Sequence, residues 1–326
     1  MLKLKYLYEN YELAKFALGN WEYDAETIDD YLQHFRISSN AVYPFLWQGN
    51  MRYLRLSPVS EKLENNLKGE MEFLCYLQSR NYPAVVPVAS NSGQLVVTIA
   101  SDWGQYYASV FEGVDGNCIE DTDCGDHILF AYGQALGQLH VLSSEYSPGT
   151  RKWTYRDVLF WIGEVLEEYC APSKMLAELE DIRQALNELP RTSDIFGLVH
   201  YDFEPDNVFW VENNRCCTAI DFEDGMYHFF LVDLEQALDA LKENIKANRR
   251  SAAESAFLRG YQSVKTLESD YAKKLELMRR FCNLYSYARL IRSVAEKYPN
   301  EPDWMVSLRE KLDCKIELLE SSVVGN

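Results

Sequence analysis

The most informative part of the sequence reads His200-Tyr201-Asp202-Phe203-Glu204-Pro205-Asp206-Asn207, and Ile220-Asp221-Phe222 follows shortly after it. Two short apolar runs lie between these stretches, joined by the turn-forming residues 212–215. This pattern predicts a β-hairpin. Because a hairpin brings its two ends together, we expect Asn207, which enters it, to lie beside Asp221, which leaves it.

These residue types suit phosphoryl transfer. Asp221 and Asn207 offer hard oxygen ligands of the kind that hold Mg²⁺ against nucleotide phosphates. Asp202 precedes Asn207 at the spacing of the kinase catalytic loop H-R-D-x-x-x-x-N, so we expect it to orient the attacking hydroxyl and accept its proton. We expect His200 to organise the loop through hydrogen bonds rather than to act as the base. An Asp-rich loop alone is usually a solvated turn, so the prediction depends on the whole ordered combination.

A second part of the sequence supports the same chemistry. Glu70 falls on the apolar stripe of a helix expected over residues 60–80, between Leu67 and Leu74. A carboxylate there faces the sheet, where an unpaired charge is costly, and Arg55 on the preceding strand is a plausible partner. A cation and a Glu paired in this way clamp the nucleotide phosphates in kinases. The alternative is that Glu70 lies at the edge of the stripe and reaches water.

The order of the expected elements predicts the architecture. Strands are expected over residues 31–37, 41–47, 51–56, 85–89, 94–100 and 106–112. Long helices follow, over residues 126–143, 156–169, 173–189 and most of 232–320. We therefore predict an α+β, bilobal fold. Its β-rich N-terminal lobe, residues 1–112, holds an antiparallel sheet and one long helix; its mostly helical C-terminal lobe, residues 113–326, follows a hinge near 112–116.

Composition limits the partners. The formal net charge of −18 would repel a phosphate backbone, so nucleic acid is a poor candidate. The same charge favours a cationic substrate or a divalent metal, although acidity also simply keeps proteins soluble. The eight cysteines form no C-x-x-C pair, and no signal peptide or membrane-spanning run is evident. We expect a cytoplasmic protein without a membrane partner, and the oligomeric state stays open.

The sequence resembles the aminoglycoside phosphotransferase-like enzymes, small-molecule kinases of the protein-kinase-like fold. The resemblance covers most of the chain. It is carried by Ser39-Asn40-Ala41-Val42-Tyr43, Tyr53-Leu54-Arg55-Leu56, Glu70-Met71-Glu72-Phe73-Leu74, Gly137-Gln138-Leu139-His140, residues 200–207, Ile220-Asp221-Phe222 and Val232-Asp233-Leu234.

This resemblance implies ATP or GTP as the phosphate donor, Mg²⁺ as the metal, and a small-molecule hydroxyl as the acceptor. It implies a catalytic Asp202, and Asn207 and Asp221 as metal ligands. The implied nucleotide-binding residues are Asn40, Arg55, Glu70, Phe111 and Glu112. Asp233 matches the Asp that follows the metal-binding segment in this family.

Three departures from the family pattern leave alternatives open. Arg55 stands where Lys is more usual, Tyr201 replaces the commoner Gly, and the nucleotide loop is based on Ser and Asn. These changes would suit a kinase-like module that binds nucleotide without catalysis. A metal-dependent hydrolase using Asp202, Asp206 and Asp221 is a third hypothesis, but it explains neither Arg55 nor Glu70.

The acceptor is not defined by any motif. Aminoglycosides, choline or ethanolamine, homoserine, methylthioribose and other sugars or amino alcohols all remain open, with a weak lean toward an amine. The aromatic clusters Tyr106-Tyr107 and residues 153–155, with Phe160-Trp161, could line a substrate pocket, although core packing explains most of them. Glu223 and Asp224 could attract a second metal or a cationic substrate, or form a solvated turn.

Overall fold

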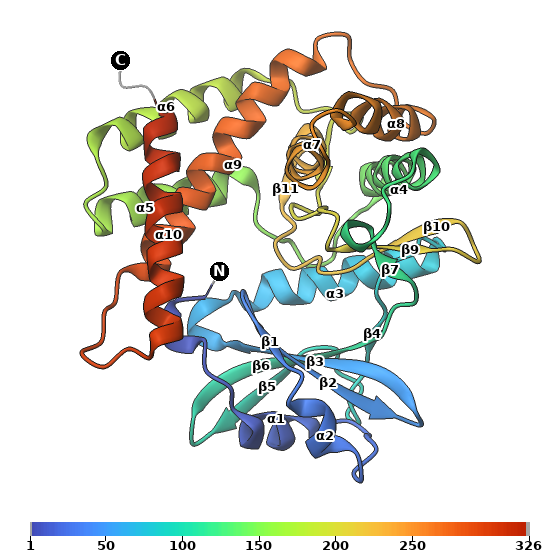
Figure 1. The fold of residues 1–326 in the computed structure, drawn as a ribbon, viewed down its shortest axis with the longest axis vertical. Coiled ribbons are helices and arrows are strands. Elements are labelled where there is room, and N and C mark those ends of the chain that lie inside the picture. Colours follow the sequence, from blue (N-terminus) through green and yellow to red (C-terminus); the bar gives the residue numbers. More distant parts are fainter. Residues whose placement is uncertain (1, 324–326) are drawn as a thin grey trace.

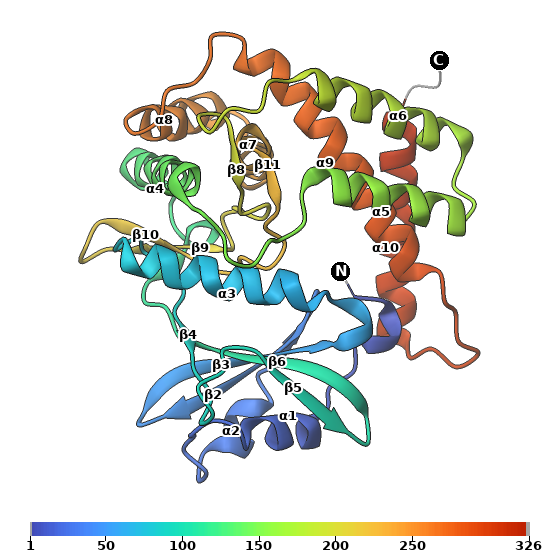
Figure 2. The same cartoon turned by 180° about the vertical axis from the view of Figure 1, so that it is seen from behind.

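The N-terminal lobe is built on an antiparallel sheet in a computed structural model that describes residues 2–323 (Figures 1 and 2). The strand order is β1-β2-β3-β6-β4, and β5 also pairs with β6. The predicted β-rich lobe is confirmed. Its strands are β1 (Arg36–Ile37), β2 (Ala41–Trp47), β3 (Asn50–Pro58), β4 (Pro87–Val88), β5 (Val97–Ser101) and β6 (Gly104–Glu112).

Helices cover both faces of this sheet. The long helix α3 (Glu64–Ser79) runs between the sheet and the C-terminal lobe, whereas α1 (Tyr11–Leu18) and α2 (Ile28–Leu32) cover the outer face (Figure 1). Buried Leu74 of α3 belongs to the same apolar cluster as Phe203 of the C-terminal lobe. The helix therefore joins the two lobes through a shared core.

Several sequence-based boundaries were wrong. The strand expected over 31–37 is reduced to β1, and its first two residues are instead the end of helix α2, whose first turn carries Asp29 and Asp30, charges that favour a helix N-terminus. The strand expected over 85–89 shrinks to β4, where Pro87 has no N–H for a ladder. Helix α3 begins at Glu64, after a 3₁₀ turn, η2 (Val59–Glu61), rather than at residue 60.

Residues 113–116 form the crossing that connects β6 to the next part of the chain, and the hinge expected there stays a prediction. Strand β7 (Asn117–Cys118) then pairs with β9 (Val208–Val211), and β9 pairs with β10 (Cys216–Ala219). The predicted hairpin is confirmed, with Val211 opposite Cys216. Gly116 has a φ of 97°, and a Cβ there would collide with the Trp210 carbonyl, so the crossing needs glycine.

Helices form most of the C-terminal lobe, as predicted. They are α4 (Asp126–Glu145), α5 (Tyr155–Glu168), α6 (Ser173–Glu188), α7 (Leu231–Asn244), α8 (Arg250–Gln262), α9 (Tyr271–Val294) and α10 (Asp303–Ser322). This lobe also holds a small pair of strands, β8 (Phe196–Leu198) and β11 (Tyr227–Phe229), and a short 3₁₀ turn, η3 (Ile119–Asp121). A further 3₁₀ turn, η1 (Leu4–Tyr6), lies in the N-terminal segment. Across residues 2–323, none of the helices has both the length and the apolar character required to cross a bilayer.

A second contact joins the lobes away from the crossing. The N-terminal segment lies against the end of α9, on the side of the molecule opposite β4 and β7 (Figure 1). Ser293 Oγ donates to the Leu2 carbonyl at 2.8 Å. Lys3 and Lys5 each place Nζ 3.0 Å from a carboxylate oxygen of Glu296. The lobes are therefore attached at both ends of the space between them.

Candidate active site

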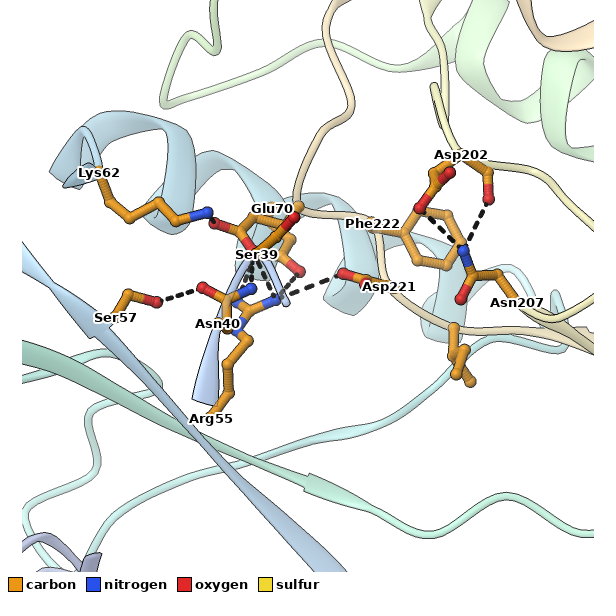
Figure 3. Close-up of polar contacts among 12 residues, drawn as sticks. Ser39, Asn40, Arg55, Ser57, Lys62, Glu70, Asp202, Asn207, Asp221 and Phe222 are labelled. Atoms are coloured by element: carbon orange, nitrogen blue, oxygen red, sulfur yellow. Dashed lines mark hydrogen bonds and ion pairs between the residues drawn. The ribbon is translucent and has the colours of Figure 1, made fainter. Parts of the chain in front are cut away.

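The loop 200–207 and the hairpin bring the predicted catalytic groups together. The side-chain nitrogen of Asn207, Nδ2, donates to Asp202 Oδ2 at 2.9 Å and to the main-chain carbonyl of Asp202 at 3.1 Å. The Ile220 N–H donates to the Asn207 carbonyl at 2.9 Å, which joins the two ends of the hairpin. The side chain of Asp221 then turns toward Arg55, while that of Asn207 faces Asp202 (Figure 3).

His200 links the catalytic loop to the strand before Asp221. Its Nε2 lies 2.8 Å from the Ile220 carbonyl, and its Nδ1 accepts the Asp202 N–H at 3.2 Å. This pattern requires a neutral ring with hydrogen on Nε2. Burial lowers the pKa of His200 to about 4, which keeps the ring neutral near pH 7. The geometry matches a residue that organises the loop.

The carboxylate of Asp233, on α7, fixes the main chain of the same loop. Its two oxygens accept the N–H groups of His200 and Tyr201 at 2.9 and 2.7 Å. His140 Nε2 lies 3.0 Å from Asp233 Oδ2, and both side chains are fully buried. Burial alone would raise the pKa of Asp233, but the hydrogen bonds from His140 and His200 outweigh burial and lower it. The carboxylate therefore acts as a rigid internal anchor.

Tyr201 explains why glycine is commoner at its position. Its φ is 62°, in the left-handed region that side chains rarely adopt. The ring is buried, and its centroid lies 5.3 Å from that of Tyr285 on α9. Aromatic packing thus accompanies a strained backbone immediately before Asp202.

The predicted ion pair of the N-terminal lobe is present. Arg55 donates to both oxygens of Glu70, at 2.9 and 2.6 Å, and the two side chains are only 6% and 1% exposed. Arg55 NH1 also lies 4.0 Å from Asp221 Oδ1 and 3.9 Å from Glu223 Oε2. Its guanidinium lies 4.8 Å from the centroid of the Phe111 ring. Arg55 therefore connects the sheet, α3 and the segment around Asp221.

Two other predicted nucleotide residues lie at the edges of this network. Asn40 is buried: its Oδ1 accepts from Ser57 Oγ at 2.6 Å, and its Nδ2 donates to Glu223. Glu112 is exposed at the end of β6, and its N–H donates to the Val86 carbonyl at 2.9 Å. The structure places both residues beside the space between the lobes, and their contacts with nucleotide stay predictions.

Carboxylates crowd the segment around Asp221. Desolvation, followed by the charge of Glu223, raises the pKa of Asp221 to about 7. Burial, followed by the charges of Asp224 and Glu204, raises the pKa of Asp202 well above its usual range, and Arg289 opposes this rise. A divalent cation fits these residues, because it would offset the crowded charge and would meet the oxygen ligands that Mg²⁺ prefers.

Known proteins share the sequence pattern and the fold of this chain. Residues 37–268, most of the chain, match the model of the phosphotransferase enzyme family. The chain belongs to the phosphotransferase enzyme family. This establishes the family resemblance that the motifs predicted.

Individual relatives of this phosphotransferase family member are distant in sequence. Amicoumacin kinase of Bacillus subtilis (strain 168) is 24% identical over 211 residues, which are 63% of this chain and 61% of that protein. Homoserine kinase of Caulobacter vibrioides (strain NA1000 / CB15N) is 26% identical over 217 residues, which are 64% of this chain and 65% of that protein. The chain thus covers less than two thirds of either relative.

Solved structures match over nearly the whole chain. An amicoumacin kinase, solved in complex with AMP-PNP, Ca²⁺ and Ami, has a TM-score of 0.77 and 22% identity, with 96% of this chain and 95% of that chain covered. A microcompartment-associated aminopropanol kinase has a TM-score of 0.71 and 18% identity, with 97% and 99% covered. The predicted bilobal α+β fold is therefore confirmed for this phosphotransferase family member.

Three cationic side chains at this site were not predicted from the sequence. Buried Lys152 donates to the carbonyls of Phe222 and Glu223 at 3.0 and 2.9 Å, and Lys62 pairs with Glu223. Arg289 on α9 places NH1 2.8 Å from Asp224 Oδ2. No local pattern marks these residues, because each reaches the site from a distant element.

A cavity of about 300 Å³ adjoins this cluster and is lined by both lobes. Two of the aromatic residues raised as possible pocket residues, Trp153 and Trp161, do line it. The others, Tyr106, Tyr107, Tyr155 and Phe160, do not. The rings of Trp161 and Tyr285 meet edge to face, with centroids 5.7 Å apart. The charged side chains along its wall are Glu61, Lys62, Glu223, Asp224, Arg289 and Arg292.

Proposed function

We propose that this protein is a kinase that uses ATP or GTP with Mg²⁺ to phosphorylate a hydroxyl group of a small molecule. The observation that carries the proposal is the joined hairpin, which holds Asp202, Asn207 and the Asp221 segment together opposite the Arg55–Glu70 pair. Membership of the phosphotransferase enzyme family supports the same reaction. We place the boundary between the lobes at residues 112–113.

In the proposed reaction, the acceptor oxygen bonds to the γ-phosphorus as the bond from that phosphorus to the bridging oxygen breaks. The hydroxyl proton passes to the carboxylate of Asp202, and the nucleoside diphosphate leaves. Arg55, fixed by Glu70, binds phosphate oxygens of the donor. Asp221 and Asn207 would hold Mg²⁺, which supplies charge neutralisation at the β- and γ-phosphates. Positioning accounts for most of the catalysis.

The cavity beside Asp224 is the proposed acceptor site. It opens next to the Asp221 segment, and its aromatic walls suit the hydrocarbon part of an amino alcohol or a larger amine. The names homoserine kinase and aminopropanol kinase among the similar proteins support an acceptor that carries an amine. An amine-bearing alcohol is therefore the acceptor class that we would test first.

A coupled assay of nucleoside diphosphate release tests the proposal against a library of hydroxylated metabolites and antibiotics. We expect at least one amine-bearing alcohol to stimulate release. In Asp202→Asn, we expect turnover to fall by about 10²-fold or more, because general-base catalysis is lost, while nucleotide binding by calorimetry is retained.

Two results would count against this function. Nucleotide binding without stimulation by any acceptor would favour a binding module that has lost catalysis. Unchanged turnover in Asp202→Asn would remove the role assigned to this carboxylate.

A further inference from the structure

Arg289 reaches from the C-terminal lobe to both sides of the proposed transfer point. Its NH1 lies 2.8 Å from Asp224 Oδ2, and its NH2 donates to Ser39 Oγ at 3.4 Å. Ser39 belongs to the predicted nucleotide loop, and Asp224 lies three residues after the predicted metal ligand Asp221. Arg289 also lines the cavity proposed for the acceptor. It therefore stands where donor and acceptor would meet.

The catalytic loop also lies close to this guanidinium. The guanidinium carbon of Arg289 is 5.3 Å from the centroid of the Tyr285 ring. That ring in turn lies 5.3 Å from the ring of Tyr201, the residue before Asp202. Aromatic packing thus connects α9 to the catalytic loop and limits the directions in which Arg289 can move.

The other cations of the site already have close partners in this structure. Arg55 gives both terminal nitrogens to Glu70, and Lys152 is bonded to two main-chain carbonyls. Lys62 is paired with buried Glu223. A guanidinium has five N–H donors, and within residues 2–323 Arg289 has polar contacts only with Asp224 and Ser39. Arg292, the other guanidinium on the cavity wall, pairs with Glu61 at 2.8 Å. Arg289 is thus the cavity-wall cation that has donors to spare and also contacts the predicted nucleotide loop, through Ser39.

On the basis of the kinase activity proposed above, we propose that Arg289 contacts the transferring phosphoryl group and stabilises its negative charge. As the acceptor–phosphorus bond forms and the bond to the nucleoside diphosphate breaks, charge spreads over the three phosphoryl oxygens. A planar guanidinium can donate to two of these oxygens at once. Asp224 holds the guanidinium in place, and the contact with Ser39 is exchanged for phosphoryl oxygen.

A mimic of the transferring group tests this role without a known acceptor. Affinity for MgADP is compared with affinity for MgADP plus aluminium fluoride, which imitates the planar phosphoryl group, in wild type, Arg289→Ala and Arg289→Lys. We expect Arg289→Ala to weaken the aluminium fluoride complex about 10- to 100-fold, the value of a charge-assisted hydrogen bond, and to change MgADP affinity by less than about threefold. Arg289→Lys should lose less than Arg289→Ala.

Arg280→Ala is the matched control. Arg280 lies on the same helix, and its ion pair with Glu178, at 2.6 Å, faces away from the cavity. We expect Arg280→Ala to bind both complexes as tightly as wild type does. We also expect its melting temperature to be similar to that of Arg289→Ala, so that a difference in binding between the two variants is not a difference in stability.

The outcomes separate the two proposals. If wild type fails to bind MgADP, the kinase function itself is wrong. Suppose instead that wild type binds both complexes. If Arg289→Ala then lowers the affinity for both complexes equally, or lowers the affinity for neither, Arg289 only ties the lobes together and the proposal is overturned. If Arg289→Ala does not fold, Arg289→Lys decides: unchanged affinity for the aluminium fluoride complex would overturn the proposal.

Discussion

The two faces of the active site are held by different kinds of bonds. On the C-terminal side, the side chains of His200, Asn207 and Asp233 bond mainly to main-chain groups of the catalytic loop and of the strand before Asp221. On the N-terminal side, Arg55 is held by pairs of side chains, chiefly its pair with Glu70. The first arrangement fixes a backbone shape, whereas the second fixes charges.

This difference suggests a division of labour. Bonds from side chains to the main chain cannot be exchanged for substrate without unfolding the loop, so the C-terminal face is preorganised for the proposed reaction. Ion contacts at 3.9 and 4.0 Å, such as those from Arg55 to Glu223 and Asp221, can give way to the phosphates of a nucleotide. The N-terminal face is therefore the adaptable side of the site.

The largest effect is expected from breaking the anchor of the preorganised face. At present Asp233 accepts hydrogen bonds from the main-chain N–H groups of His200 and Tyr201, in a fully buried position. Asp233→Asn places an amide NH₂, itself a donor, against one of these donors. We expect the free energy of unfolding to fall by about 3–5 kcal/mol, as for other broken buried pairs. Denaturation in urea measures this loss. Asp239→Asn, on the exposed side of the same helix, should change it by less than about 0.5 kcal/mol; a similar loss in both variants would contradict the anchor role.

On the adaptable face, substitutions of Arg55 and Glu70 should affect the unfolding free energy and the nucleotide affinity separately. Arg55→Met leaves Glu70 buried and unpaired, and we expect a loss of about 3–5 kcal/mol in unfolding free energy. Adding Glu70→Leu should restore most of that stability, because an apolar pair replaces the ion pair. Nucleotide affinity should stay about tenfold or more below wild type in the double variant, because phosphate loses its charged partner. Recovery of nucleotide affinity with stability would show that Arg55 is only structural.

The smallest effect is expected at the tip of the hairpin that joins the two faces. Arg215 has a φ of 50° in the exposed turn of the hairpin, at the end away from both Asn207 and Asp221. Arg215→Gly relieves this left-handed strain but gives the unfolded chain more freedom, so the unfolding free energy should change by less than about 1 kcal/mol. Turnover in the assay above should not change. A large loss of turnover would mean that the tip does more than connect the two strands.

The same contrast explains what the sequence could predict. The proximity of Asp202, Asn207 and the Asp221 segment was predictable because turn residues and short strands fix how a hairpin folds. The position of Glu70 beside Arg55 was predictable from helical periodicity. Helix α2 was missed because a five-residue helix is too short for a periodic pattern. Arg289 and Lys152 were missed because their positions depend on how distant elements pack, which no local pattern encodes.

The N-terminal segment has a mechanical consequence. Its contacts with Ser293 and Glu296 lie on the opposite side of the molecule from the chain crossing at residues 113–116 (Figure 2). A body attached to another at two separated points can rotate only about the line through those points. While both contacts are kept, we expect the two lobes to rotate relative to one another about this line rather than to open by a hinge motion.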